Sequence, residues 1–190
     1  MNSNNLVIYK LIKPTSYLAE IPILLSFNIL LVVCAYLSIN LPFSPVPITG
    51  QTFGVLIIAM ALGKTRGVSV IMAYLLEGAM GLPVFAGGTA GMVKFVGPTG
   101  GYLFGFLGAA FVVGYLADKG WDKGYFKSAV VMILGTVIIF LCGLLWLLHF
   151  VPLENVFTVG LIPFIPGAIV KISVASVILP SVWKSVRYIK

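Results

Sequence analysis

Residues 165–180 read IPGAIVKISVASVILP, an apolar run that carries a single charge, Lys171. No other charged residue lies between Glu154 and Lys184. A helix that spans a membrane needs about 20 predominantly apolar residues, and this stretch with its flanks provides them. Inside such a helix an ammonium group costs roughly a few kcal/mol unless it is paired or hydrated. The stretch therefore predicts a membrane helix whose lysine must meet a compensating group.

The composition of the whole chain agrees with a bilayer as its solvent. Of the 190 residues, 60% are hydrophobic and 9% are charged, whereas an ordinary soluble domain is about 25% charged. The formal net charge of +7 does not indicate a nucleic-acid partner, because the basic residues are dispersed between apolar runs instead of forming one solvated patch. No long polar stretch interrupts the chain, so we expect a single all-α integral membrane domain over residues 1–190.

Charged turns and segments rich in Pro and Gly divide the chain into six predicted membrane helices. The second and third helices are short, and the basic turn KTR at residues 64–66 separates them. A protein with four spans and a re-entrant hairpin is therefore the structural alternative. The predicted spans cover approximately residues 18–40, 51–63, 67–80, 98–117, 128–150 and 163–185.

The distribution of basic residues predicts how these spans are oriented, since cytoplasmic loops carry an excess of Lys and Arg. With both termini on the cytoplasmic side, the outer connections are residues 41–50, 81–101 and 151–163. These connections contain one basic residue, Lys94, and one more, Lys171, lies within a span. All the others fall on the cytoplasmic side: Lys10, Lys13, Lys64, Arg66, Lys119, Lys123, Lys127, Lys184, Arg187 and Lys190.

Two interpretations of Lys171 are open from the residues alone. Either the lysine extends toward the membrane surface or pairs with Glu77, the other charge well inside a span. Or it faces a water-accessible cavity and binds an anionic group of a ligand, for which intramembrane ionisable residues are typical. As a point charge, a lysine suits a single carboxylate or phosphate.

Polar side chains gather toward the same outer side as Lys171. Gln51 offers an amide donor and acceptor, and Tyr102 offers a hydroxyl beside a flat ring, which together suit a neutral polar heterocycle. Each residue also has a structural explanation, because tyrosines anchor helices at membrane interfaces and Gln51 and Thr52 suit a helix start. Their convergence favours a ligand site, with the Gly-rich connections as a lid. The polar cluster consists of Thr49, Gln51, Thr52, Tyr74, Glu77, Thr99 and Tyr102.

The sequence carries no pattern typical of catalysis or energy coupling. The sequence GKT at residues 63–65 matches the end of a phosphate-binding loop. That loop also requires a glycine five residues before Gly63, where this chain has Ile58. His149 has no partner at metal-binding spacing, and no Ser/His/Asp arrangement or acid pair is present. We therefore expect a protein that is not an enzyme, holds no metal or cofactor and does not itself hydrolyse ATP.

Four motifs resemble, in order, those of a known family, and the resemblance covers nearly the whole chain from about residue 40. They are PVPITGQTFGVLIIAMALG at 45–63, GLPVFAGG at 81–88, GPTGGYLFGF at 97–106 and PFIPGAIVK at 163–171. The chain is similar to the biotin-specific S components of energy-coupling factor (ECF) transporters, the BioY family. The resemblance implies a six-helix protein of the cell membrane that captures biotin from outside with high affinity. It further implies delivery by docking on a module of one transmembrane coupling protein and two ATPase subunits.

The resemblance also implies roles for individual residues. Lys171 matches the lysine of the family's PGDxxK pattern, in which this chain has Ala168 at the acidic position. The family's first helix docks through an AxxxA face, and alignment on Ala35 puts Leu31 at the other small position, so docking is expected at Leu31 and Ala35. The expected biotin site comprises Lys171, Gln51, Thr52, Tyr74, Glu77, Phe85, Gly88, Thr99 and Tyr102.

Three other functions are compared with this one. They are an S component for another small carboxylate vitamin, a membrane-embedded enzyme, and a helical interaction subunit without a ligand. An enzyme requires a catalytic constellation, and a pure interaction subunit has no use for polar residues that converge with Lys171 on one side. The sequence therefore favours a vitamin-binding transporter subunit.

Overall fold

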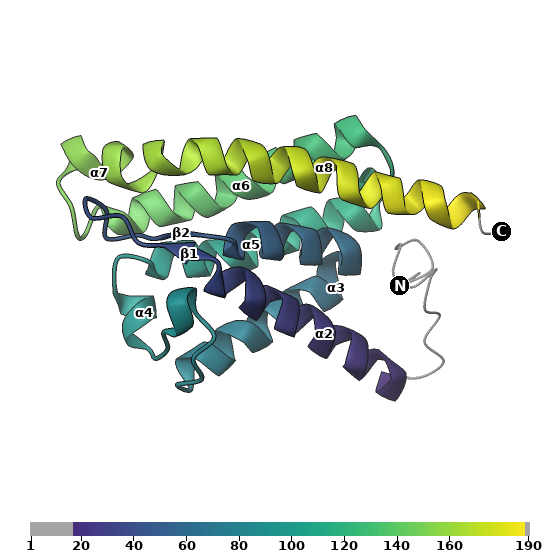
Figure 1. Cartoon of the computed structure of the whole chain (residues 1–190), viewed down its shortest axis with the longest axis horizontal. Helices are drawn as coiled ribbons and strands as arrows, with labels where there is room; N and C mark the ends of the chain where they lie inside the picture. Colours follow the sequence, from purple (N-terminus) through teal and green to yellow (C-terminus); the bar gives the residue numbers. More distant parts are fainter. Residues whose placement is uncertain (1–16, 189–190) are drawn as a thin grey trace.

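The computed structural model describes residues 17–188, which form a bundle of helices (Figure 1). Five helical segments in this part are long and apolar enough to cross a membrane, so the predicted all-α membrane fold is confirmed. The long helices are α2 (Tyr17–Tyr36), α3 (Gln51–Ala79), α5 (Gly100–Asp118), α6 (Tyr125–Leu147) and α8 (Ile165–Tyr188). The shorter elements are β1 (Ser38–Ile39), β2 (Ile48–Thr49), η2 (Ala86–Gly88), α4 (Val93–Val96), η3 (Trp121–Lys123), α7 (Leu153–Gly160) and η4 (Ile162–Phe164).

Helix α3 turns back on itself at Gly63, where the backbone leaves the helical region with φ 74° and ψ −176°. A Cβ atom on Gly67 would lie 2.9 Å from the Cα of Ala59, although eight residues of unbroken helix extend about 12 Å. The positive φ at Gly63 is one that glycine adopts without steric cost. Two short arms, residues 51–62 and 64–79, therefore pack side by side, and the reversal occurs at the predicted boundary between the second and third helices.

The helices pack in a sequence of neighbours, with α2 on α3, α3 on α5, α5 on α6 and α6 on α8. Small residues allow the closest of these contacts. A Cβ atom on Gly114 would lie 2.6 Å from the backbone nitrogen of Lys64, and one on Gly101 would lie 2.2 Å from the Cβ of Trp146. In a membrane, where lipid tails are as apolar as the helix surface, close packing of this kind is what holds helices together.

The bundle has two chemically different ends. One end, here called the ribbon end, holds the β1–β2 ribbon, α4 and α7, and the other, the terminal end, holds the start of α2 and the end of α8 (Figure 1). The terminal end is tied by polar contacts between elements far apart in sequence: Arg66 pairs with Glu20, and the Lys64 backbone N–H donates to Asp118 at 3.2 Å. Lys10, Lys13 and Lys190, which the orientation prediction uses, lie outside the described residues.

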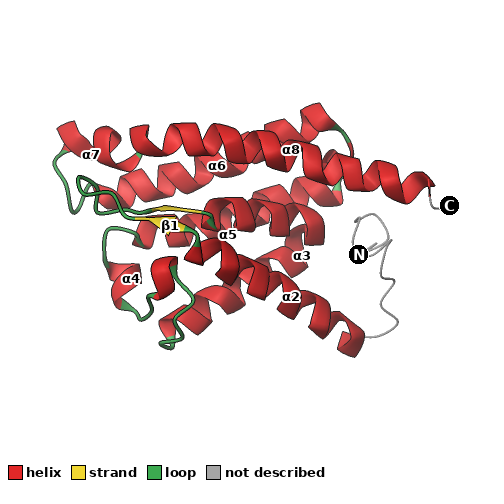
Figure 2. Cartoon of the chain, viewed as in Figure 1, coloured by secondary structure: helices red, strands yellow, loops and turns green. Residues whose placement is uncertain are grey.

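The three predicted outer connections all lie at the ribbon end, and they are more ordered than the sequence indicates (Figure 2). The segment 41–50 closes an antiparallel ribbon in which Ser38 pairs with Thr49. The Gly-rich segment contains η2 and α4, and the segment 151–163 contains α7. The first long helix ends at Tyr36 instead of residue 40, because the chain there enters the ribbon.

Candidate ligand-binding cavity

A cavity of about 310 Å³ lies at the ribbon end, enclosed by the ribbon and by the ends of α3, α5 and α8. Its volume is within the range of sites that bind small molecules. Much of its wall is apolar and aromatic, including Leu56, Phe85, Leu103, Phe106, Phe140 and Phe164. Its polar lining includes Thr49, Gln51, Thr52, Lys94, Thr99 and Lys171. Such a wall suits a ligand with an apolar body and polar groups at defined positions.

Lys171 lies in the second turn of α8, and its ammonium reaches across the cavity wall to the start of α3. Its Nζ donates to the carbonyl oxygen of Thr49 and to Thr52 Oγ1, the latter at 3.0 Å. The interpretation that Lys171 pairs with Glu77 is wrong, since Glu77 Oε1 instead accepts a hydrogen bond from Asn28 Nδ2 at 3.2 Å. Polar groups of the ribbon and α3 thus compensate the charge, and one of its three donors stays available.

Gln51 is the first residue of α3, and it is 5% exposed at the cavity wall. Its amide Nε2 donates to the hydroxyl of Tyr74 at 2.6 Å. Tyr74 comes from the second arm of α3, is fully buried, and does not line the cavity. The described residues offer no donor to the Gln51 amide oxygen. The fold therefore holds the Gln51 amide in place through Tyr74 and leaves an acceptor for a ligand.

The start of α5 supplies Thr99 and Tyr102, which both line the cavity. The hydroxyl of Tyr102 donates to the carbonyl of Gly160 at 2.8 Å, so the residue presents its ring to the cavity while its O–H ties α5 to α7. Phe85 also lines the cavity and packs edge-on against Tyr74, with ring centroids 5.5 Å apart. Aromatic rings held in this way form rigid apolar walls.

Three of the nine predicted site residues do not line the cavity. The second arm of α3 carries Tyr74 beneath Gln51 and turns Glu77 toward Asn28 on α2. Gly88 lies beside the hydroxyl of Tyr36, and its neighbour Gly87 lines the cavity in its place. The hairpin directs the side chains of Tyr74 and Glu77 away from the cavity, so direct ligand contact by these three residues stays a prediction that the cavity lining does not support.

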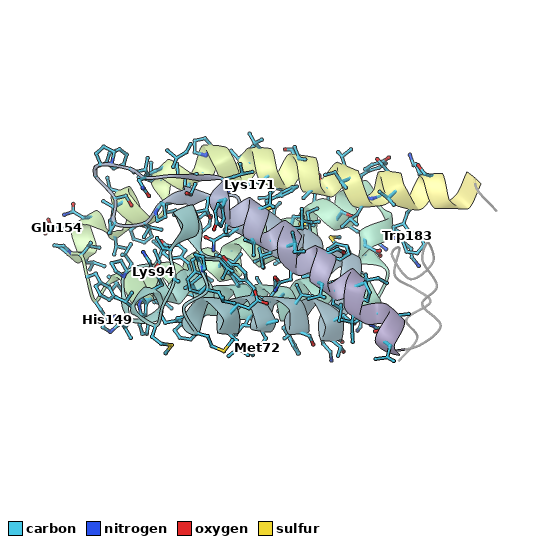
Figure 3. All side chains as sticks on the ribbon, turned by 60° about the horizontal axis from the view of Figure 1, so that its bottom comes forward. Met72, Lys94, His149, Glu154, Lys171 and Trp183 are labelled. Carbon is cyan, nitrogen blue, oxygen red and sulfur yellow. The ribbon has the colours of Figure 1, made fainter. Side chains whose placement is uncertain are left out.

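The sequence analysis missed Lys94 as a site residue. Lys94 is on the short helix α4 and lines the cavity together with Lys171. These are the two charged residues in the lining formed by the described residues. In Figure 3, Lys94 lies nearer than Lys171 to the end marked by His149 and Glu154. The sequence signal was a lone cation within an otherwise uncharged, Gly-rich segment.

The predicted docking residues on α2 are both inaccessible. Leu31 and Ala35 are 0% exposed. A Cβ atom on Gly54 of α3 would lie 2.9 Å from Leu31 Cδ1. Both side chains are buried within the bundle, so in this conformation neither is accessible to a partner, and docking through them stays a prediction. The outward face of α2 carries other apolar residues, among them Leu25, Ile29 and Val33.

Comparison with known proteins places the chain among membrane transporters. The model of the BioY family matches residues 9–188. A relative from Thermotoga maritima named "Biotin transporter BioY" is 43% identical over 153 residues, which cover 80% of this chain and 88% of the relative. A relative from Pyrococcus horikoshii named "Probable biotin transporter BioY" is 36% identical over 159 residues, covering 84% and 93%.

A solved structure shares the fold. It is the crystal structure of "the S-component for biotin from an ECF-type ABC transporter". It is 28% identical to this chain and superposes with a TM-score of 0.80, covering 88% of this chain and 92% of the solved one. The arrangement of the helices, the match over nearly the whole sequence and the curated relatives agree: the chain belongs to the BioY family.

Proposed function

We propose that this protein binds biotin in the cavity at the ribbon end and acts as the substrate-capture subunit of an ECF-type transporter. The observation that carries the proposal is the lining of the cavity: aromatic walls, one amide with a free acceptor, and ammonium groups without a neighbouring acid. Biotin offers a carboxylate, a ureido ring with paired donors and acceptors, and an apolar thioether ring and valeryl chain. These groups match the lining in kind.

Within this proposal the residues divide into contacts and supports. Lys171, Gln51, Thr52 and Thr99 supply polar contacts, and the rings of Phe85 and Tyr102 enclose the apolar part of the ligand. Tyr74 acts as a support, because it positions the Gln51 amide from behind the wall. The required chemistry is binding alone, so the proposal involves no metal or cofactor.

We further propose six membrane spans over one domain, with the two arms of α3 as separate short spans and both termini in the cytoplasm of a multi-pass cell-membrane protein. The distribution of charge supports this orientation, because basic residues near membrane helices favour the cytoplasmic side. Lys64, Arg66, Lys119, Lys123 and Lys184 lie in turns or at helix ends of the terminal end. The cavity then opens toward the outside, from which the ligand arrives.

For transport against a gradient, the proposed partners are a transmembrane coupling protein and two ATPase subunits, with the bilayer around them and no nucleic acid. The similarity to a solved S-component of an ECF-type ABC transporter supports an assembly of this kind. The exposed apolar side of α2 around Leu25, Ile29 and Val33 takes the place of Leu31 and Ala35 as the proposed contact surface.

The test is equilibrium binding of radiolabelled biotin to the purified chain in detergent, without ATP or partner subunits. We expect saturable binding that unlabelled biotin displaces and a panel of other vitamins does not. A second candidate is another small carboxylate vitamin, because Ala168 lines the cavity at the position where the family's PGDxxK pattern has an acidic residue. Tight binding of another vitamin with no response to biotin would assign the cavity to that ligand instead.

A further inference from the structure

Three lysines meet at the terminal end, where the turn η3 packs against α5, α6 and α8. Lys123 lies on η3, Lys127 in the first turn of α6 and Lys184 near the end of α8. Figure 3 places Trp183, the sequence neighbour of Lys184, toward the other end of the molecule from Lys94. The three lysines, here called the basic patch, are separate from the cavity, whose lining contains none of them.

Each lysine of the basic patch reaches an aromatic ring on a neighbouring element. The contacts run from η3 to α8, from α8 to α6 and from α6 back to η3, so they hold three ammonium groups around one junction. A ring attracts an ammonium through its negative face, but it carries no net charge that would neutralise the cation. The pairs, with the distance from Nζ to the ring centroid, are Lys123 with Trp183 (4.8 Å), Lys184 with Tyr125 (4.7 Å) and Lys127 with Trp121 (5.8 Å).

The acidic residues of this region are already engaged within the chain. Asp118 Oδ2 accepts a hydrogen bond from the backbone N–H of Lys64 at 3.2 Å. Asp122 is 0% exposed, and its Oδ2 accepts a hydrogen bond from the indole N–H of Trp183. Among the described residues, no ammonium of the basic patch forms an ion pair. The junction therefore carries three positive charges that lack an anionic partner from this part of the chain.

The start of α6 adds exposed aromatic surface beside these charges. Phe126 is 82% exposed, and it lies between Tyr125 and Lys127 in the sequence. Aromatic side chains at the ends of membrane helices lie at the level of the lipid headgroups, and basic pockets between such helices bind anionic headgroups. A phospholipid can meet both features, because its phosphate suits the lysines and its acyl chains suit Phe126. A soluble phosphate ion would use the charges alone.

We infer that the basic patch binds the headgroup of an anionic phospholipid, for which phosphatidylglycerol is the probe. The phosphate oxygens accept charge-assisted hydrogen bonds from the ammonium groups, and Phe126 contacts the acyl chains. Zwitterionic phospholipids bind more weakly, because their own positive group is repelled by the lysines. The inference concerns a second binding site, and it does not depend on the proposed binding of biotin.

The experiment measures quenching of tryptophan fluorescence by lipids with brominated acyl chains, added to the purified full chain in detergent. Trp146 donates to the carbonyl of Gly97 at the ribbon end, so Trp146→Phe leaves Trp121 and Trp183 at the junction as the reporters. We expect a higher apparent affinity for brominated phosphatidylglycerol than for brominated phosphatidylcholine. Raising the salt concentration from about 0.1 to about 1 M should reduce this preference, because the Debye length falls from about 10 to about 3 Å.

Substitutions test the three lysines one by one in this background. Lys123→Gln, Lys127→Gln and Lys184→Gln should each reduce the preference for phosphatidylglycerol about fivefold, and the triple variant should bind both lipids equally. Arginine at the same three positions keeps the charge and should keep the preference. The matched control is Lys94→Gln, which removes one charge at the ribbon end and should leave the preference unchanged.

Thermal melting checks that each variant is folded. If Trp146→Phe does not fold, the readout becomes the melting temperature of the chain with all its tryptophans. Phosphatidylglycerol should then raise the melting temperature more than phosphatidylcholine does, and the triple variant should lose this difference.

Three outcomes would overturn the inference: equal affinity of the folded protein for the two lipids, a triple variant that keeps the preference, or a loss in Lys94→Gln as large as in Lys127→Gln. Displacement of the lipid by soluble glycerol phosphate would overturn it as well, because the patch would then recognise the phosphate alone. Biotin affinity should be unchanged in every variant of the basic patch, since none of its lysines lines the cavity.

Discussion

The charged side chains at the two ends of the bundle differ in whether the chain provides them with a partner of opposite charge. At the terminal end Arg66 donates to both carboxylate oxygens of Glu20, at 2.8 and 2.6 Å, and Trp183 donates to Asp122. At the ribbon end Lys94 and Lys171 line a cavity that no described acid shares. Charges that are paired within the chain fix the positions of helices, whereas charges without an acid are available to a ligand.

Lysines at the terminal end have a second kind of partner. Their ammonium groups lie over aromatic rings at centroid distances between 4.6 and 5.8 Å, a favourable arrangement because the face of the ring is negative. The pairs are Lys64 with Phe111, Lys119 with Tyr115, Lys123 with Trp183, Lys127 with Trp121 and Lys184 with Tyr125. Substitutions at the terminal end should therefore change stability, and those at the ribbon end should change binding.

The largest expected effect is on ligand affinity in Lys171→Met. The substitution keeps most of the side-chain volume and removes a charge from a membrane helix, so thermal stability should be equal to or above that of the wild type. Biotin binding should weaken by about 10- to 150-fold, as for loss of a charged hydrogen bond. Radioligand binding and thermal melting on the same preparation separate the two quantities. A variant that is destabilised but binds normally would show that Lys171 has a structural role.

A pH effect on stability is the second prediction, and it concerns Asp122 in the turn between α5 and α6. Burial raises the pKa of this carboxyl to about 6, although the hydrogen bond from Trp183 lowers it. Because the folded protein then binds the proton more tightly than the unfolded chain does, this contribution to stability is present at low pH. It decreases by about 2 kcal/mol as the pH rises from about 4 to 7.

Asp122→Asn isolates this effect, because the amide does not titrate and its oxygen still accepts from Trp183. The difference in melting temperature between variant and wild type should favour the variant increasingly as the pH rises. Biotin affinity should be the same for both proteins at each pH. A constant difference in melting temperature across this range would show that Asp122 is not the titrating group.

The third prediction concerns the ion pair between Glu20 and Arg66 at the terminal end. Glu20→Gln removes the charge opposite Arg66, and because both side chains are partly exposed, the free energy of unfolding should fall by only about 1 kcal/mol. The affinity for biotin should not change, since neither residue lines the cavity. Chemical denaturation and ligand titration provide the two readouts. Weaker biotin binding at unchanged stability would contradict the division between the two ends.

The smallest effect is expected at Tyr74, which supports Gln51 but does not itself line the cavity. Tyr74→Phe removes the hydroxyl that accepts the hydrogen bond from Gln51, so the amide is no longer held in one orientation. Biotin binding should weaken by about 2- to 10-fold, the range of one neutral hydrogen bond. Tyr115→Phe, at the terminal end, is the matched control and should bind as the wild type does. A loss of more than about 100-fold in Tyr74→Phe would indicate direct contact between the hydroxyl and the ligand.

Part of the candidate site was predictable from the residues. Gln51, Thr52, Thr99 and Lys171 were expected on the outer side and do line one cavity, because each lies at the outer end of a predicted span. Phe85 was expected from the resemblance to the family, and it lines the cavity as well. Which of these residues contact the ligand is a proposal that the binding experiments test.

The contacts of other residues could not be predicted without the tertiary structure. Tyr74 and Glu77 are three residues apart and share a helical face, but the reversal at Gly63 determines that this face meets Gln51 and Asn28 instead of the cavity. Leu31 and Ala35 likewise share a face, which packs on α3. Helical periodicity predicts which side chains lie together, and it does not predict which neighbour they meet.

The sequence by itself determined the solvent, the all-helical fold class and the family. Long apolar runs with few charges are stable as helices in lipid, where every backbone polar group must be satisfied internally, and Gly63 marks where the chain can reverse. Only the tertiary structure decided which cations face the cavity. Lys171 reaches Thr52 across 119 residues of sequence, and Lys94 joins it because Phe95 anchors α4 against Phe85. Contacts of this kind depend on how separate segments pack, and that information is distributed over the whole chain.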